Sequence, residues 1–232
     1  MDKRGRLKVS VLWAELKKNI TLPIVPVLVV STVTLNVIVT AVFLNRWALA
    51  SNDILKIVPT YTSIGVIAIS AVLTTHEYDG NQICTSLLAV PQRTFLITVK
   101  TIVILIISMT VSLAAMLASL TVLNYHSAET NSILPVVLGT IHLGVLSAIT
   151  LGIGLMFRSM VTTLSTSLII LIVAYPVLRP IAELAEWLPS RLSSEIFITT
   201  ELSSTIDNYI ALFEWMACIM LTGGIRFVLS DG

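Results

Sequence analysis

Charged side chains are scarce in this sequence. Only 12% of its 232 residues are Asp, Glu, Lys or Arg, whereas 56% are hydrophobic. Soluble domains carry about 25% charged residues, so a soluble fold of this length would leave much apolar surface in water. The net charge of +1 creates no positive field for nucleic acid, and we expect no such partner. Two cysteines, Cys84 and Cys218, are too few for a disulfide framework, and we interpret them as unpaired thiols.

Several motifs of nucleotide-binding and catalytic sites are also missing. No G-x-x-x-x-G-K-[ST] occurs, so the chain has no P-loop for ATP. His76-Glu77 begins like the zinc-protease motif H-E-x-x-H, but Gly80 stands where the second histidine is needed. Gly152-Ile153-Gly154 lacks the third glycine of a dinucleotide-binding loop. We therefore expect no enzymatic activity, no metal and no cofactor on this chain.

Six apolar runs are long enough to cross a hydrocarbon core, which requires about 20 residues. We predict an all-α protein with six transmembrane helices, at Leu22–Leu44, Ile57–Thr74, Thr101–Leu123, Ile133–Met156, Ser159–Leu178 and Tyr209–Leu229. A polar leader at 1–21 precedes this domain at 22–229, and a short tail at 230–232 follows it. The first run lacks a small-residue cleavage site, so we expect it to remain as a span.

The distribution of Lys and Arg predicts the orientation of the chain. The leader, the second and fourth links between spans and the last span hold ten of the 14 basic residues, and the other side holds four. By the positive-inside rule, both termini are expected in the cytoplasm.

The leader has the pattern of an amphipathic helix. One arc of about 100° on a helical wheel holds its apolar residues, which are Val9, Leu12, Trp13, Leu16 and Ile20. Such a helix lies in the membrane interface, with Trp13 toward the acyl chains and Lys17 toward anionic headgroups. The leader is either a basic anchor that sets the topology or an elbow helix that packs against the spans. For the elbow we single out Trp13, Glu15 and Lys17.

The segment 75–93 is the longest polar interruption on the predicted cytoplasmic side. Asp79-Gly80-Asn81 has turn chemistry. Ile83, Leu87 and Val90 then recur at helical spacing, and Pro91 ends the pattern. We expect a short amphipathic helix at 83–90. Its Ile/Leu face either fills a groove on a partner protein or lies in the headgroup layer.

The segment 179–208, between the fifth and sixth spans, is the longest on the opposite side. Ile181, Leu184, Ala185 and Leu188 repeat at helical spacing, and Ser193-Ser194-Glu195 has the pattern of a second helix start. We expect two short helices that lie at the outer surface or dip into it, with a solvated connector as the alternative.

The predicted spans carry no charge near their centres. Lys100, Arg158, Glu214 and Arg226 all fall near predicted span ends, and Lys100 is close enough to the membrane edge to snorkel to it. A charge at mid-depth costs about 2.5–3.5 kcal/mol and marks proton or ion relays. Energy for uphill transport would therefore have to enter from outside the membrane region.

A few polar and small residues do lie inside the spans. Asn36 and His142 are candidates for a substrate lining, but an interhelical hydrogen bond is the interpretation that we favour. Gly144, Ala148 and Gly152 form a stripe of small residues that predicts close helix approach, within the bundle or between subunits.

The order of these features resembles the membrane subunits of type-2 ATP-binding-cassette (ABC) exporters, especially the permeases of the bacitracin and lantibiotic self-protection group. The architecture matches over the whole chain, and the sequence match is confined to Thr75–Lys100. The residues that carry it are Glu77, Gly80, the helix at 83–90, Pro91, Arg93 and Lys100.

The resemblance implies a permease of the bacterial plasma membrane that exports a hydrophobic or amphipathic substrate, such as a peptide antibiotic, a drug or a lipid-like molecule. Two copies of a separate ABC ATPase subunit would bind ATP and Mg²⁺, and a second permease, identical or homologous, would complete the transporter. The implied ATPase interface consists of Glu77, Asp79, Gly80, Gln82, Ile83, Leu87 and Arg93. The alternative is a membrane immunity or scaffold protein that sequesters a toxin or a partner without transport.

Overall fold

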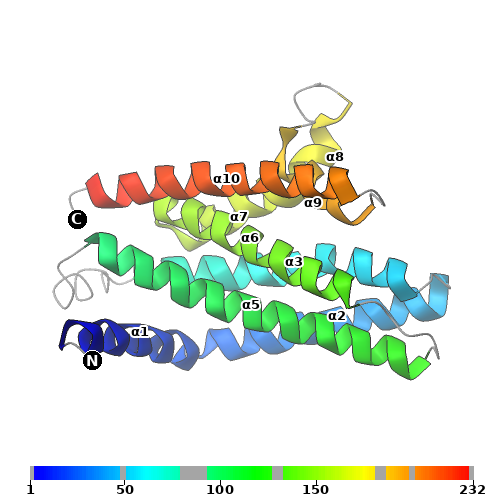
Figure 1. Ribbon diagram of the computed structural model, residues 1–232, viewed down its shortest axis with the longest axis horizontal. Helices are drawn as coiled ribbons and strands as arrows, with labels where there is room; N and C mark the ends of the chain where they lie inside the picture. Colours follow the sequence, from blue (N-terminus) through cyan, green and yellow to red (C-terminus); the bar gives the residue numbers. More distant parts are fainter. Residues whose placement is uncertain are drawn as a thin grey trace.

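The computed structural model describes residues 3–47, 51–78, 93–126, 133–180, 187–198 and 202–229. Helices account for 94% of these residues, and no strand occurs among them, which confirms the all-α prediction. The elements are α1 (Lys3–Thr21), α2 (Ile24–Trp47), α3 (Ser51–Thr75), α5 (Arg93–His126), α6 (Leu134–Phe157), α7 (Met160–Leu168), the π-helical turn η1 (Ile169–Val173), α8 (Ala174–Leu178), α9 (Pro189–Ile198) and α10 (Leu202–Leu229). They form an elongated bundle (Figure 1).

Six helical stretches in the described part of the chain are long and apolar enough to cross a membrane. Five are single helices, and the fifth span joins α7, η1 and α8 over Met160–Leu178. The protein is therefore a multi-pass membrane protein with the six spans that the sequence predicts. We call the end of the bundle that holds α1 and the last turn of α10 the α1 end (Figure 1).

The second, third and sixth spans begin before the apolar runs that the sequence marks, because backbone hydrogen bonds continue a helix through polar residues that lower the local hydropathy. For the third span, a helical extension over 94–99 is expected from the sequence. The second span begins at Asp53, the third at Thr94 and the sixth at Thr205. The third helix therefore includes Lys100 seven residues after its first residue, Arg93. The sixth includes Glu214 nine residues after Thr205. At 1.5 Å per residue, Glu214 lies about 13 Å from Thr205 along this helix, farther from its start than the predicted span at 209–229 implies.

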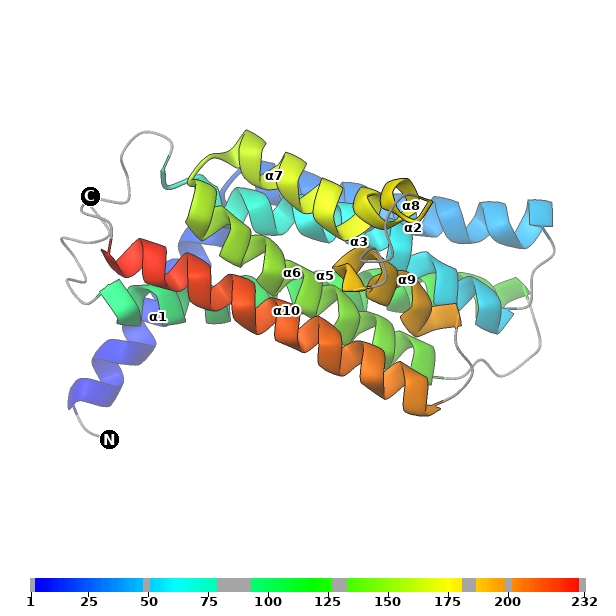
Figure 2. The same ribbon diagram turned by 90° about the horizontal axis from the view of Figure 1, so that it is seen from above.

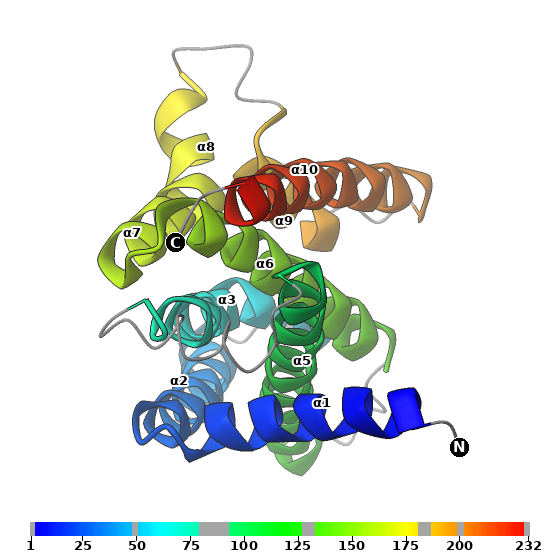
Figure 3. The same cartoon turned by 90° about the vertical axis from the view of Figure 1, so that its left-hand side faces the viewer.

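α6 is the central helix of the bundle. Every residue from His142 to Leu155 is buried, and α3, α5 and α10 pack around it (Figures 2 and 3). The stripe of small residues explains the close approach: a Cβ atom on Gly152 would lie 3.0 Å from the backbone oxygen of Ile219 in α10. Gly144 faces the side chain of Met109 in α5, where a Cβ atom would lie 2.8 Å from the terminal methyl carbon. Of the two alternatives for the stripe, the structure shows packing within the bundle.

α1 lies across the end of the bundle, crosswise to the spans (Figure 3). Leu12 and Leu16 pack against a hydrophobic core formed largely by α3 and α5, which supports the elbow interpretation of the leader. Trp13 and Ile20 remain 64% and 52% exposed. The apolar arc of the leader is therefore divided between the bundle and the surroundings.

α9 is the short helix that the sequence predicts between the fifth and sixth spans, but it starts at Pro189 and not at Ser193. Proline is favoured in a first helical turn, where its missing N–H is not needed. Leu192 and Ile196 are buried in a core shared with α6, η1 and α10, so this helix dips into the bundle and is no solvated connector. Most of the other predicted short helix, at 181–188, lies outside the described residues.

Candidate functional site

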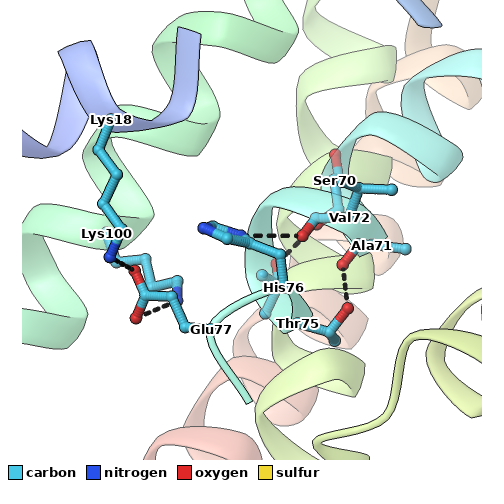
Figure 4. Close-up of polar contacts among 9 residues, drawn as sticks. Lys18, Ser70, Ala71, Val72, Thr75, His76, Glu77 and Lys100 are labelled. Carbon is cyan, nitrogen blue, oxygen red and sulfur yellow. Dashed lines mark hydrogen bonds and ion pairs between the residues drawn. The ribbon is translucent and has the colours of Figure 1, made fainter. Parts of the chain in front are cut away.

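Glu77 is the centre of a buried charge cluster at the α1 end. It lies in the turn that follows α3 and is only 1% exposed. Its carboxylate accepts a hydrogen bond of 2.9 Å from Nζ of Lys18 in α1 and forms an ion pair of 3.1 Å with Nζ of Lys100 in α5. The two lysines converge on it from different helices (Figure 4). A single carboxylate thus joins the elbow helix to the second and third spans.

The chain after α3 winds tightly and places Glu77 beneath α1. The backbone N–H of His76 donates to the carbonyl of Val72, and that of Tyr78 donates to the carbonyl of Thr75. The hydroxyl of Thr75 donates back to the carbonyl of Ala71 at 2.7 Å (Figure 4). These local bonds hold the turn and leave the Glu77 carboxylate for the two lysines.

The lysines keep Glu77 ionised. Burial alone would raise the pKa of its carboxyl, but the charge of Lys100 and the hydrogen bond from Lys18 outweigh burial and hold the pKa below the ordinary 4.5. Glu15 of α1 shows the opposite balance, because burial and the nearby Glu77 charge raise its pKa above 4.5. The cluster therefore contains one firmly ionised carboxylate and a second that is easier to protonate.

Tyr78 extends the cluster to the link between α6 and α7. Its ring centroid lies 5.9 Å from Nζ of Lys100 and 5.8 Å from the guanidinium carbon of Arg158, within the range of cation–π attraction. Burial raises the pKa of Tyr78 to about 12, so its phenol stays neutral. Arg158 has a left-handed backbone with φ of 55°, which few residues other than glycine adopt. Its N–H donates to the carbonyl of Gly154 and ends α6.

We call this group the Glu77 cluster and define it as Glu15, Lys18, Glu77, Tyr78, Lys100 and Arg158. It includes the predicted residues Glu77 and Glu15. Lys100 was expected to snorkel to the membrane edge. It is instead only 5% exposed and turns inward, because the Glu77 carboxylate lies within its reach. Lys18 was overlooked although Glu15 and Lys18 share a helix face at i, i+3. No local pattern connects Tyr78 with Arg158.

The other predicted interface residues are placed as follows. Trp13 and Lys17 are exposed on α1. Asp79, Gly80, Gln82, Ile83 and Leu87, and with them the predicted helix at 83–90, lie outside the described residues. Arg93 is the first residue of α5.

The two polar residues inside the spans are both 1% exposed. Nε2 of His142 is 2.8 Å from the hydroxyl of Ser193, a hydrogen bond between α6 and α9. Asn36 lies on the buried face of α2, one turn before Thr40, whose hydroxyl donates to that of Ser119 in α5. His142 thus makes the interhelical bond that we favoured. The side-chain amide of Asn36 makes no hydrogen bond to any described residue, so the expected bond is not found there.

The Glu77 cluster has the chemistry of a joint between helices. In the part of the chain that the structure describes, no group of three His, Cys, Asp or Glu side chains is placed to hold a metal ion. Paired charges of this kind fix the relative positions of helices. A scan against models of known protein families finds no match for this chain, and a search of curated proteins finds no relative.

Proposed function

We propose that this chain is the permease subunit of an ABC exporter in the bacterial plasma membrane, with both termini in the cytoplasm and ATP hydrolysed by a separate subunit. The observation that carries the proposal is the pair of contacts from Lys18 and Lys100 to Glu77. They connect α1, α3 and α5 next to the segment 79–92, where the resemblance locates the ATPase contact. On the predicted orientation, the cluster lies at the cytoplasmic membrane surface.

The ion pairs tie the helices together at this end of the permease. Removing one partner of a buried pair such as Lys100–Glu77 costs about 3–5 kcal/mol, so α5 and the end of α3 are expected to move together. The Lys18 side chain is 34% exposed, so its pair holds α1 to them more weakly. The segment 79–92 is attached to these helices at both ends, by Tyr78 on one side and by α5 on the other. A movement imposed on the segment by a partner therefore reaches two spans and the elbow helix at once.

This arrangement gives Glu77 and the segment different roles. The Glu77 carboxylate is buried against lysines of its own chain, so it positions the segment and does not contact the ATPase directly. The apolar face of the predicted helix, with Ile83 and Leu87, fills the groove on the ATPase. Two ATPases carrying ATP and Mg²⁺ then drive two permeases against each other.

The exposed faces of the outer helices fit a permease that works as a pair. In the first, fifth and sixth spans only 17% of the residues in an 18-residue apolar stretch are buried within the chain, against 78% in the fourth span. These apolar faces are available to lipid and to a second permease, identical or homologous. The substrate that suits such surroundings is hydrophobic or amphipathic.

Purification from the native membrane tests the proposal. We expect a P-loop ATPase to copurify with the wild-type chain, and Leu87→Asp to abolish this association. Thr85→Asp is the matched control, because Thr85 lies on the opposite face of the predicted helix and its change should be tolerated. Retention of the ATPase and of export by Leu87→Asp would overturn the proposal. Binding of a toxin by a chain that never copurifies with an ATPase would instead support the immunity or scaffold alternative.

A further inference from the structure

A small pocket on the side of α10 combines a carboxylate with two indole rings. It has a volume of about 230 Å³ and is lined by Trp187, Ala211, Glu214, Trp215 and Cys218. Trp187 lies two residues before the start of α9, and the other residues come from three successive turns of α10. The pocket lies on the part of α10 that packs beside α9, which the basic residues predict to be on the outer side of the membrane.

Glu214 is an unusual residue for this depth. Its side chain is exposed on the bundle surface about 13 Å along the span, where lipid and not water is the expected surrounding. Among the described residues, Glu214 forms no ion pair. A carboxylate at such a depth is unfavourable unless it is protonated or meets a cation, and residues of this kind usually mark a function.

The two tryptophans are arranged around this carboxylate. Nε1–H of Trp215 donates a hydrogen bond of 2.9 Å to the backbone carbonyl of Trp187, which fixes the two residues relative to each other. Trp187 is 71% exposed. Tryptophans alone are common at membrane interfaces as anchors. An anchor does not require a carboxylate in the same pocket, whereas indole faces together with a carboxylate are the groups that attract an organic cation.

We propose that Glu214, Trp187 and Trp215 form a binding site for a hydrophobic organic cation that enters from the lipid. The cation is held by the charge of Glu214 and by the indole faces, and its apolar arms remain in contact with lipid and with Ala211. The pocket volume accommodates the charged centre and one arm of such a molecule, not the whole of it. Binding at this site is a property of the chain alone and does not require the proposed ATPase.

The test is equilibrium binding of radiolabelled tetraphenylphosphonium to the full chain in lipid nanodiscs. We expect saturable binding that excess unlabelled tetraphenylphosphonium displaces. Glu214→Gln should weaken the affinity about tenfold, and Trp187→Leu about fivefold. Asp207→Asn is the control, because Asp207 is an exposed carboxylate of α10 outside the pocket and its loss should leave binding unchanged.

Cys218 provides a second and independent measurement. It is an exposed thiol one helical turn from Glu214. In a Cys84→Ser background, tetraphenylphosphonium should slow its alkylation by N-ethylmaleimide, and Glu214→Gln should remove this protection while Glu214→Asp retains it. Equal affinity of the Glu214→Gln variant would overturn the proposal, as would unprotected Cys218 at saturating cation. Neither result depends on ATPase association, so a failure here is distinct from a failure of the exporter proposal.

Discussion

Lys18 and Glu77 are 59 residues apart in the sequence, and yet the Lys18 ammonium donates a 2.9 Å hydrogen bond to the buried Glu77 carboxylate. This contact ties the amphipathic leader to the end of the second span. Because Lys100 holds the other carboxylate oxygen, the leader and the third span are linked through the same side chain.

Lys18→Met should loosen α1 from the bundle, whereas Lys17→Met should not. Lys18 contacts Glu77 and Lys17 is exposed, although the two residues are neighbours in the sequence. The Lys18 side chain is 34% exposed, so solvent screens the pair and we expect a loss of only about 1 kcal/mol. In a chain of this length, that corresponds to a fall in Tm of about 2–4 °C. Equal Tm values for the two variants would contradict the assignment.

Lys100→Met should destabilise the protein more than the double variant Lys100→Met/Glu77→Gln. The single change leaves the Glu77 carboxylate buried with only one ammonium, and removing one partner of a buried pair costs about 3–5 kcal/mol. The double change removes the uncompensated charge and should recover part of that loss. Thermal unfolding of the wild type, both single variants and the double variant gives the coupling energy. A double variant less stable than Lys100→Met would show that the two side chains do not act as a pair.

Apparent stability should fall as the pH drops below 6.5, because the folded protein disfavours the protonated form of His76. Burial lowers its pKa below 6.5, and the charge of Lys100 adds to this effect, while Glu77 opposes it. A histidine whose pKa is lowered in the folded state contributes its full stability above the pKa that it has in the unfolded chain. That contribution is lost as the pH falls through its pKa in the folded state. Tm measured between pH 8 and about pH 5 should therefore decline in the wild type and decline less in His76→Gln.

Glu77 also makes the stability fall with decreasing pH, but in a more acidic range. Its pKa lies below 4.5, so its contribution to stability is lost only as the pH falls further. Glu15 has the opposite effect, because its pKa in the folded protein lies above 4.5 and stability rises as the pH falls through that pKa. Neither carboxylate produces a loss of stability between pH 6.5 and 5, so an equal decline of Tm in His76→Gln and in the wild type would contradict the assignment to His76.

The six spans and the elbow were predictable because hydropathy and helical periodicity are local properties of the sequence. The contact of Tyr78 with Arg158 was not predictable, since it depends on how the turn after α3 meets the end of α6, 80 residues later. The early start of α10, at Leu202, was not predictable for a different reason. Hydropathy marks where apolar residues are dense, whereas a helix ends where its backbone hydrogen bonds end, and Leu202–Tyr209 continue α10 with polar side chains.

The start of α9 shows a similar limit. Ser193-Ser194-Glu195 has a capping pattern, but Pro189 begins the helix and the backbone N–H groups of Arg191 and Leu192 donate to the carbonyl of Leu188. Once the first turn is formed, Ser193 is available for another partner, and it bonds to His142. The sequence contains two adjacent signals for the start of this helix. The burial of Leu192 and Ile196 decides which of them is used, and burial depends on the tertiary structure.

Gly223 and Gly224 are adjacent in α10 but should respond in opposite ways to alanine. A Cβ atom on Gly223 would collide with the backbone carbonyl oxygen of Gly152 in α6, and no flexible side chain can move aside to relieve that contact. A Cβ atom on Gly224 would meet nothing within 4 Å. Gly223→Ala is therefore expected to separate α6 from α10 at a cost of about 1–3 kcal/mol. Gly224→Ala should be neutral or stabilise the helix by up to about 1 kcal/mol, because alanine loses less backbone entropy than glycine.

Thermal unfolding of the two variants, which have the same composition, provides the comparison. A Gly223→Ala protein as stable as Gly224→Ala would show that α6 and α10 do not approach as closely as the backbone contact requires.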